Sequence, residues 1–247
     1  MIIKEIKAKS ILSKSQIYDY TLNAYVGCQH NCIYCYAKFM KRFTGHKEAW
    51  GDFVDVKINA PELLAKEVKK KKKGAVWISG VCDAYQPLEE KYELSRKCIE
   101  ILVENDWTFT IQTKSPIVLR DIELFKKAIN YEVGFSISTA QEKIRSIFEP
   151  SAPPIMERVN ALAALHNSGI KTFVMIAPML PGVEGLPEIL KGNVDYVMID
   201  RMNYHYADWL YKKQNMQYAM GDEFFIQNSD KLLTEFKNAS VDCQRLF

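Results

Sequence analysis

The chain has 247 residues and a mass of 28.5 kDa, with 48% hydrophobic and 26% charged residues. These ordinary globular values exclude a disordered or fibrous protein and allow the buried core of one large domain or two small ones. No apolar stretch has the length of a membrane span, and the charged N-terminal residues lack the apolar core of a signal peptide. We therefore expect a cytoplasmic protein.

The net charge of +3 is unevenly distributed along the chain. Residues 1–47 contain eight Lys or Arg against two acidic residues, which leaves 25 basic and 28 acidic residues in the rest. A basic N-terminal region can favour an anionic partner. Solvated surface lysines are the more common explanation of such a composition, and both interpretations stay open.

Short apolar segments alternate with longer amphipathic ones. The expected strands are 22–26, 75–79, 107–113, 133–139, 171–177 and 195–200. The expected helices are 61–73, 90–104, 115–130, 154–168, 184–191 and 229–238. Most strands are separated by roughly 25 to 35 residues, which is the length of a βα unit. The alternation therefore predicts parallel strands with helices outside them.

Six βα units predict an α/β fold, a partial (β/α)6 TIM-type barrel with parallel strands and a C-terminal cap at 207–247. A doubly wound sheet is the alternative, although no G-x-G-x-x-G motif follows any expected strand. We expect a single domain over 1–247 with its core at about 20–200. In such barrels the chemistry lies in loops after the carboxyl ends of the strands. The lysine run 69–73 ends a helix and is expected at the opposite end.

Three cysteines lie within eight residues, directly after the first expected strand. Cys28, Cys32 and Cys35 form a C-x3-C-x2-C arrangement, which can present three thiolates to Zn²⁺ or to an iron–sulfur cluster. Structural zinc takes four ligands, so a fourth residue such as His30 would have to complete a zinc site. Three thiolates suit a [4Fe–4S] cluster that keeps one iron open.

This arrangement, with an aromatic residue (Tyr34) before the third cysteine, resembles the radical S-adenosylmethionine (SAM) superfamily. The segments NAYVGCQHNCIYCYA, SGVCDAYQP and FEPSAPPIMERVNALAALHNSGIKTFVMIAPMLPG are similar to the spore photoproduct lyase and DNA repair photolyase-like family. The resemblance covers roughly residues 20–200. It implies a [4Fe–4S] cluster whose open iron binds SAM, and an electron donor of the flavodoxin or ferredoxin type. It also implies reductive cleavage of SAM to a 5′-deoxyadenosyl radical that abstracts hydrogen from a substrate, with nucleic acid as a candidate.

Further site residues follow from the same resemblance. It implies that Tyr34 packs near SAM, that Lys114 pairs with the SAM carboxylate, and that Ser138 contacts its ribose or carboxylate. Tyr36 matches a tyrosine implicated in radical relay. Asp83 and Ala177, which lie at the ends of two expected strands, are further candidates for cofactor binding.

Cys82 has three possible roles. The resemblance aligns it with a serine that touches the amino-acid part of SAM. The hydrogen-donating cysteine of the lyase is replaced here by Gly80. A hydrogen donor, a fourth cluster ligand and a packing thiol all stay open for Cys82.

A polar and aromatic segment follows the last expected strand. Arg201 can bind a carboxylate or phosphate, and neighbouring aromatic rings can stack on a base. The candidate substrate contacts are Tyr85, Arg201, Asn203, Tyr204 and His205. A loop network beneath the C-terminal segment explains these residues as well. The competing functional hypothesis is a non-catalytic zinc or iron–sulfur module that binds nucleic acid.

Overall fold

The computed structural model describes residues 1–247, which form two compact units. The first unit comprises residues 1–31 and 37–133, and the second comprises residues 32–36 and 134–247. The chain therefore passes from the first unit to the second and back again within the cysteine loop. Cys28 belongs to the first unit, whereas Cys32 and Cys35 belong to the second.

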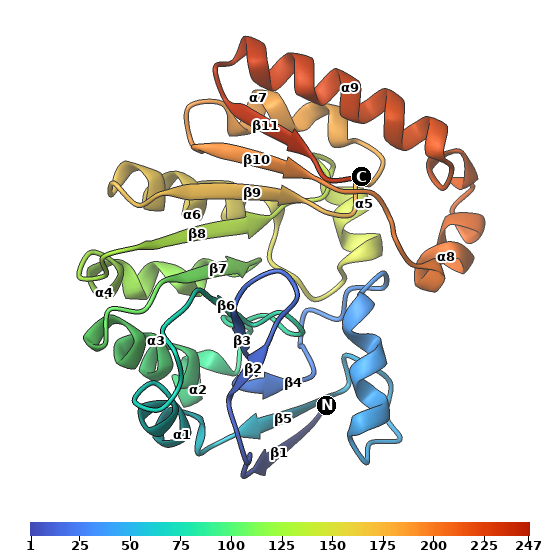
Figure 1. Cartoon of the computed structure of the whole chain (residues 1–247). Coiled ribbons are helices and arrows are strands. Elements are labelled where there is room, and N and C mark those ends of the chain that lie inside the picture. Colours follow the sequence, from blue (N-terminus) through green and yellow to red (C-terminus); the bar gives the residue numbers. More distant parts are fainter. The chain divides into compact units, whose positions relative to one another are not determined.

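The first unit contains strands of two sheets (Figure 1). In one, β3 (Tyr20–Leu22), β6 (Val76–Ile78) and β7 (Phe109–Thr113) are parallel neighbours, and β2 (Leu12–Lys14) pairs antiparallel with β3. In the other, β5 (Phe53–Lys57) pairs parallel with β1 (Ile2–Ile6) and antiparallel with β4 (Tyr25–Val26). Most apolar side chains of β3, β5, β6 and β7 are buried and form the core of this unit.

The helices of the first unit are short. The α-helices are α1 (Ala60–Glu67), α2 (Glu89–Tyr92), α3 (Leu94–Glu104) and α4 (Ile122–Phe125). The 3-10 helices are η1 (Tyr36–Phe43), whose first residue lies in the second unit, and η2 (Pro116–Asp121). Pro61 lies at the start of α1, where its missing N–H costs no hydrogen bond. The expected helix 90–104 is divided because Glu93 adopts a left-handed backbone with φ of 52°.

The second unit contains the remaining strands, in the order β8, β9, β10, β11. β8 (Tyr131–Ser136) enters this unit at Gly134, and β9 (Thr172–Ile176), β10 (Tyr196–Ile199) and β11 (Asp242–Arg245) follow. β10 pairs parallel with both β9 and β11. Gly134 lets β8 approach β9 closely, because an added Cβ would lie 2.3 Å from the ring of Phe173.

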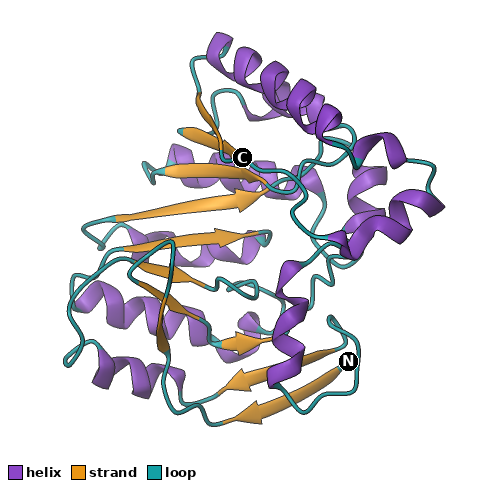
Figure 2. Cartoon of the chain, turned by 45° about the vertical axis from the view of Figure 1, so that its right-hand side comes forward, coloured by secondary structure: helices purple, strands orange, loops and turns teal.

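Helices cover the strands of the second unit (Figures 1 and 2). The α-helices are α5 (Glu142–Phe148), α6 (Ile155–Asn167), α7 (Leu186–Leu190), α8 (Asp208–Lys213) and α9 (Asp222–Asn238). The 3-10 helices are η3 (Val183–Gly185), η4 (His205–Ala207) and η5 (Gln217–Ala219). Helix α6 buries Val159, Leu162 and Leu165, which recur at helical spacing. Helix α9 packs against β11 and α7.

The structure confirms the expected α/β class and corrects several elements. The expected strand 22–26 is two short strands, β3 and β4, and the helix expected over 61–73 ends at Glu67, before the lysine run. The C-terminal segment expected as a cap also adds a strand, β11. No helix combines the length and the apolar character that crossing a membrane requires. A single domain over 1–247 stays a prediction.

Candidate active site

The first half of the cysteine loop is held by a glutamine pair in the first unit. Gly27 has a φ of 97°, and a Cβ there would lie 2.2 Å from the carbonyl oxygen of Phe53, so only glycine fits before Cys28. The Gln29 amide donates to Oε1 of Gln86 at 3.0 Å, and Gln86 Nε2 donates to the Gly27 carbonyl at 3.3 Å. Gln86 is fully buried. These bonds fix the backbone on both sides of Cys28.

His30 attaches the same half of the loop to Asp83. Its Nε2 lies 3.1 Å from Asp83 Oδ2, and both side chains are buried. Asp83 also accepts hydrogen bonds from the Thr113 hydroxyl at 2.6 Å and the Lys114 amide at 2.7 Å. Burial opposes ionisation of Asp83, but His30 and these two donors outweigh it and lower its pKa to about 2. Asp83 is therefore a carboxylate that connects the cysteine loop to the end of β7.

Cys82 lies beside Asp83 as a partly buried thiol. Its Sγ is 3.5 Å from the Tyr25 carbonyl, a hydrogen bond that the thiol donates. Burial is the main cause that raises its pKa to about 11, and the charge of Lys57 opposes that rise. Cys82 therefore keeps its proton at neutral pH.

Two further predicted residues of the first unit differ in exposure. Lys114 is half-buried directly after β7, and its backbone belongs to the Asp83 network. Tyr85 is fully buried, and its hydroxyl donates to Asp121 Oδ2 at 2.9 Å. Burial, followed by the charge of Asp121, raises the pKa of Tyr85 well above its usual value. A substrate contact by Tyr85 would require this packing to open.

The second half of the loop packs into the second unit. The Ile33 amide donates to the Phe148 carbonyl at 2.8 Å, and the Cys35 amide donates to the Cys32 carbonyl at 3.1 Å. Cys32 and Tyr34 are buried in an apolar cluster with Phe148 and residues of α5, α8 and neighbouring loops. The segment between the second and third cysteines is therefore part of the core of this unit.

A buried polar network contacts the hydroxyl of Tyr34. Its hydroxyl donates to Oε1 of Glu149 and lies within 3.5 Å of Ser138 Oγ. Glu149 Oε2 lies 2.6 Å from Nη2 of Arg158, and both side chains are almost completely buried. Burial, followed by the charge of Glu149, raises the pKa of Tyr34 well above its usual value, so the phenol stays protonated.

Arg158 continues this network into the backbone of the second unit. Its Nε donates to the Pro153 carbonyl at 2.9 Å, and its Nη1 donates to the Ser136 carbonyl at 3.1 Å. The network therefore connects Tyr34 to the end of β8 and to the proline-rich turn before α6. Of the predicted residues, Ser138 is buried after β8, and Ala177 is half-buried directly after β9.

The predicted radical-relay residue Tyr36 lies at one end of a row of three stacked tyrosines. Its ring centroid is 6.1 Å from that of Tyr204, which in turn is 5.9 Å from that of Tyr206. All three rings are exposed. Stacked, exposed rings offer a flat aromatic surface that a base can extend.

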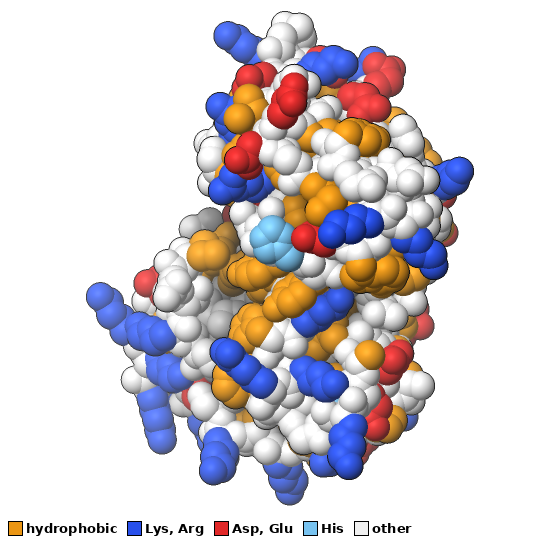
Figure 3. Space-filling model, turned by 90° about the vertical axis from the view of Figure 1, so that its right-hand side faces the viewer, with side chains coloured by type: hydrophobic (Ala, Val, Ile, Leu, Met, Phe, Trp, Pro, Cys, Tyr) orange, Lys and Arg blue, Asp and Glu red, His pale blue; other side chains and the backbone are white.

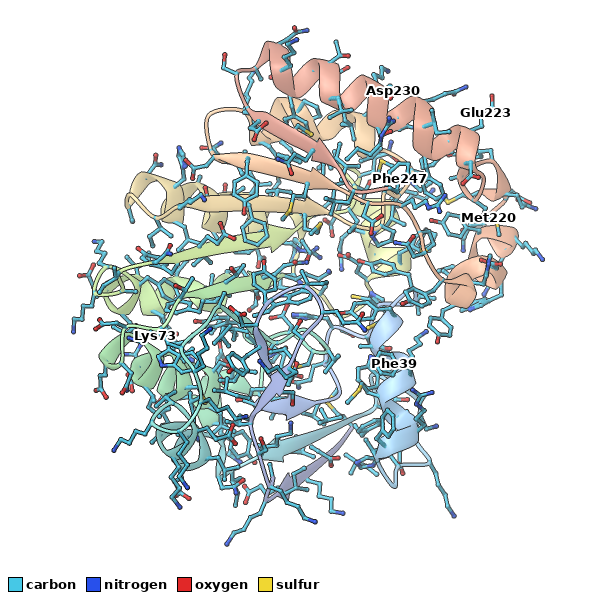
Figure 4. The ribbon with its side chains drawn as sticks, viewed as in Figure 1. Phe39, Lys73, Met220, Glu223, Asp230 and Phe247 are labelled. Atoms are coloured by element: carbon cyan, nitrogen blue, oxygen red, sulfur yellow. The ribbon has the colours of Figure 1, made fainter.

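The polar residues beside this row make local contacts. Arg201 donates to Asp222 at 3.0 Å, and its guanidinium lies 5.7 Å from the ring centroid of Phe247, which Figure 4 labels. Asn203 donates to Asp200 at 2.8 Å. The His205 side chain is 95% exposed, and its Nδ1 lies 3.0 Å from Oδ2 of Asp208. The structure therefore brings Tyr36 and Tyr204 together but gives Arg201 and Asn203 carboxylate partners of their own.

The donor set fits an iron–sulfur cluster chemically. None of the six cysteines forms a disulfide, so Cys28, Cys32 and Cys35 keep the thiol groups that cluster ligation requires. No group of three or more His, Cys, Asp and Glu side chains is identified in the structure as able to hold a metal ion. The three-cysteine ligand set therefore stays a prediction that rests on its spacing.

Glu149 and Arg158 are functional candidates that the sequence analysis missed. They belong to the quoted segment FEPSAPPIMERVNALAALHNSG, but no motif of catalytic residues marks them. Arg158 lies in the apolar stripe of α6, where a charge requires a buried partner. A charged residue on the apolar face of a helix indicates a buried ion pair, and this signal is present in the sequence. Only the fold shows that Glu149 is the partner of Arg158.

Comparison with known proteins identifies the family. The family model described as the radical SAM superfamily matches residues 22–185, which include all three clustered cysteines. An uncharacterised protein of Methanocaldococcus jannaschii is 34% identical over 218 residues, which cover 87% of this chain and 80% of that protein.

Solved structures show the same fold. Spore photoproduct lyase complexed with dinucleoside spore photoproduct has a TM-score of 0.73 and 14% identity, and covers 99% of this chain and 82% of that one. A variant of that lyase was solved with bound AdoMet. Streptococcus suis SuiB bound to its precursor peptide SuiA has a TM-score of 0.61 and 13% identity, and covers 92% of this chain and 48% of that one. These likenesses confirm the partial-barrel type of α/β fold. The chain belongs to the radical SAM superfamily of enzymes.

Proposed function

We propose that this enzyme binds a [4Fe–4S] cluster through Cys28, Cys32 and Cys35 and uses SAM to abstract a hydrogen atom from a nucleic-acid substrate. One observation carries the proposal: the C-x3-C-x2-C loop lies inside the segment that matches the radical SAM family model. When bound, the cluster supplies the electron that cleaves SAM reductively and so makes hydrogen abstraction possible. A flavodoxin or ferredoxin would deliver that electron.

The residues around the cysteine loop hold its backbone in place. Asp83 holds the first half through His30, and Glu149 holds the second half through Tyr34. Both carboxylates are buried, and each is paired with a cationic or hydrogen-bonding group in its own unit. Such support keeps the loop backbone in one conformation and limits the reorganisation needed when a cluster is loaded.

The strand-end residues would bind SAM. Lys114 and Ser138 offer a cation and a hydroxyl to its carboxylate and ribose, and Asp83 and Ala177 are further candidates after β6 and β9. Because the Asp83 side chain already accepts several hydrogen bonds, we assign it to positioning Lys114 rather than to direct binding.

Cys82 is proposed as a hydrogen-atom donor. A donor must carry its S–H bond at working pH, and the pKa of about 11 provides this. Tyr36 is proposed as the relay partner because its ring is exposed and stacked on Tyr204.

Two observations support nucleic acid as the substrate. Residues 1–47 hold eight basic and two acidic residues, whereas the rest of the chain is net acidic. The row formed by Tyr36, Tyr204 and Tyr206 is an exposed stacking surface. One solved relative of this fold is complexed with a dinucleoside lesion, whereas another is bound to a peptide. Substrate trials should therefore compare oligonucleotides with peptides.

The test is anaerobic reconstitution of wild type, Cys28→Ser and Cys243→Ser, followed by iron and sulfide analysis. Cys243 lies in the edge strand β11, far along the chain from the loop, and serves as the matched thiol control. We expect about four irons and four sulfides per chain in wild type and in Cys243→Ser. Cys28→Ser should lose most of both. One zinc per chain in place of iron, or full iron content in Cys28→Ser, would contradict the proposal.

A further inference from the structure

A shallow pocket of about 610 Å³ lies in the first unit, beside η1. It is open to solvent and is lined by Lys38, Lys41, Arg42 and His46, together with Phe39 and Thr44. We call it the η1 pocket. Four of these six side chains are basic, whereas acidic residues do not line it. A concave basic surface attracts an anion more strongly than the same charges on a convex one, because the charges converge on one volume.

Aromatic rings accompany the charges. The Arg42 guanidinium lies 4.6 Å from the ring centroid of Phe43 and 5.5 Å from that of Phe39. Phe43 is 67% exposed, which is unusual for so large an apolar side chain. Figure 3 looks onto the side that carries η1 and shows Lys and Arg side chains interspersed with hydrophobic ones. Basic groups interleaved with exposed rings are the pattern that binds the backbone and bases of a single strand.

Internal hydrogen bonds shape the pocket. Lys41 Nζ donates to the Lys47 carbonyl at 2.9 Å, and the Thr44 hydroxyl donates to the Lys41 carbonyl at 2.8 Å. His46 bonds to Asp55 at 2.9 Å and stacks on Phe53, which fixes one wall on the core strand β5. The charged groups are therefore presented from a structured loop.

We infer that the η1 pocket binds the phosphodiester backbone of a single-stranded nucleic acid, with Phe43 stacking on an adjacent base. The pocket lies on the chain directly after Cys35, since η1 begins at Tyr36. A role of the η1 pocket in guiding substrate to the cysteine loop rests on the proposed function. Binding of single-stranded nucleic acid by the pocket does not depend on that function. Charge complementarity favours nucleic acid over an apolar partner. An anionic membrane surface is the alternative partner, and the experiment below distinguishes it from nucleic acid.

The experiment compares two triple variants with the same loss of charge. The first is Lys38→Gln/Lys41→Gln/Arg42→Gln in the pocket. The control is Lys69→Gln/Lys70→Gln/Lys73→Gln in the exposed lysine run of the same unit. Figure 4 labels Phe39 and Lys73, which lie on opposite sides of this unit. Binding of a fluorescein-labelled oligothymidylate to reconstituted protein is followed by anisotropy over a range of salt concentrations.

We expect the pocket variant to bind at least about tenfold more weakly at low salt, with a salt slope smaller by about two, because each phosphate contact to a single strand contributes about 0.7. The control should stay within about twofold of wild type. Phe43→Leu should weaken oligothymidylate binding and leave binding of heparin, a polyanion without bases, unchanged.

Three results would overturn the inference. The first is an equal loss of oligonucleotide binding in both triple variants, and the second is no oligonucleotide binding by wild type at low salt. The third is that the pocket residues are needed to bind phosphatidylserine vesicles but not to bind the oligonucleotide. Formation of 5′-deoxyadenosine from SAM and dithionite is measured in the same samples. Its failure in wild type would count against the proposed function, whereas the anisotropy results test the pocket alone.

Discussion

Two buried carboxylates hold the two halves of the cysteine loop, one in each unit. Asp83 contacts His30 in the first unit, and Glu149 contacts Tyr34 in the second. Neither anchor can be recognised from sequence spacing, because each is distant from its partner along the chain. The cysteines could be predicted because a cluster needs several thiolates in one short loop, whereas a buried acid only needs one partner in space.

Glu149→Gln should destabilise the protein strongly. It leaves Arg158 charged and buried without its counter-ion, a change that typically costs about 3–5 kcal/mol. The matched control is Glu188→Gln, which breaks the solvent-exposed pair with Lys191 in the same unit and should cost less than about 1 kcal/mol. Urea unfolding measures both. An equal loss of unfolding free energy in the two variants would show that the buried pair of Glu149 and Arg158 does not support the loop.

Cys82→Ala should change product formation rather than cofactor cleavage. If Cys82 returns hydrogen to the substrate radical, the variant still forms 5′-deoxyadenosine but yields less of the wild-type product. Cys243→Ser is the control thiol and should behave like wild type. The two products are quantified in the same reaction by mass spectrometry. A loss of 5′-deoxyadenosine together with iron would instead indicate that Cys82 supports the cluster.

At the scale of elements, the apolar strands were predictable and the polar ones were not. Continuous apolar runs form β9 and β10, and both strands lie where expected. β1 and β11 are mostly exposed and carry charged residues, so their sequences give no strand signal. They form because neighbouring strands offer backbone partners, which is a tertiary effect. Helix α5 is also absent from the expected elements, because its seven residues are too short a run to show a clear helical pattern.

The helix expected over 61–73 shows a second limit of sequence reasoning. Pro61 marks its beginning correctly, but α1 ends at Glu67. Five successive lysines follow, and their mutual repulsion opposes the close spacing of a helix. One lysine at a helix C-terminus is favourable because it faces the negative end of the helix dipole, whereas five in succession also repel one another.

The turn before Cys28 gives an element-scale prediction. Gly27→Ala adds a Cβ 2.2 Å from a backbone oxygen at a φ of 97°. Gly192→Ala also has a positive φ, of 75°, but meets no atom within 4 Å. The control should therefore cost only the roughly 1–2 kcal/mol of a left-handed residue, and Gly27→Ala should cost more. Denaturant unfolding and iron content after reconstitution are the measurements. Equal stability of the two variants would contradict a tight turn.

His46 gives the loop before β5 a pH dependence. Its hydrogen bond to Asp55, and a weaker one to Glu48, raise the pKa of His46 above its usual 6.5. The stabilisation from protonated His46 is therefore fully present below that usual value and is lost as pH rises through the raised pKa. The stability difference between wild type and His46→Gln should be larger at about pH 5.5 than at about pH 8.5. A difference that grows with pH would reverse the assigned sign.

At the scale of the whole molecule, the family and the fold class could be predicted, and the finer site could not. The cysteine spacing and the alternation of strands and helices both report repeated, local patterns. The row formed by Tyr36, Tyr204 and Tyr206 depends instead on folding residues from distant parts of one unit onto each other. Similarly, Tyr85 seemed to be a loop residue available to substrate, but the first unit buries it completely.

The central claim is that this chain uses a three-cysteine iron–sulfur cluster to cleave SAM reductively. Its most direct test is the amount of 5′-deoxyadenosine formed when reconstituted protein is reduced anaerobically with dithionite in the presence of SAM. We predict that wild type forms 5′-deoxyadenosine and that Cys32→Ser forms none above the protein-free control. A folded, iron-loaded wild type that leaves SAM intact would contradict the account.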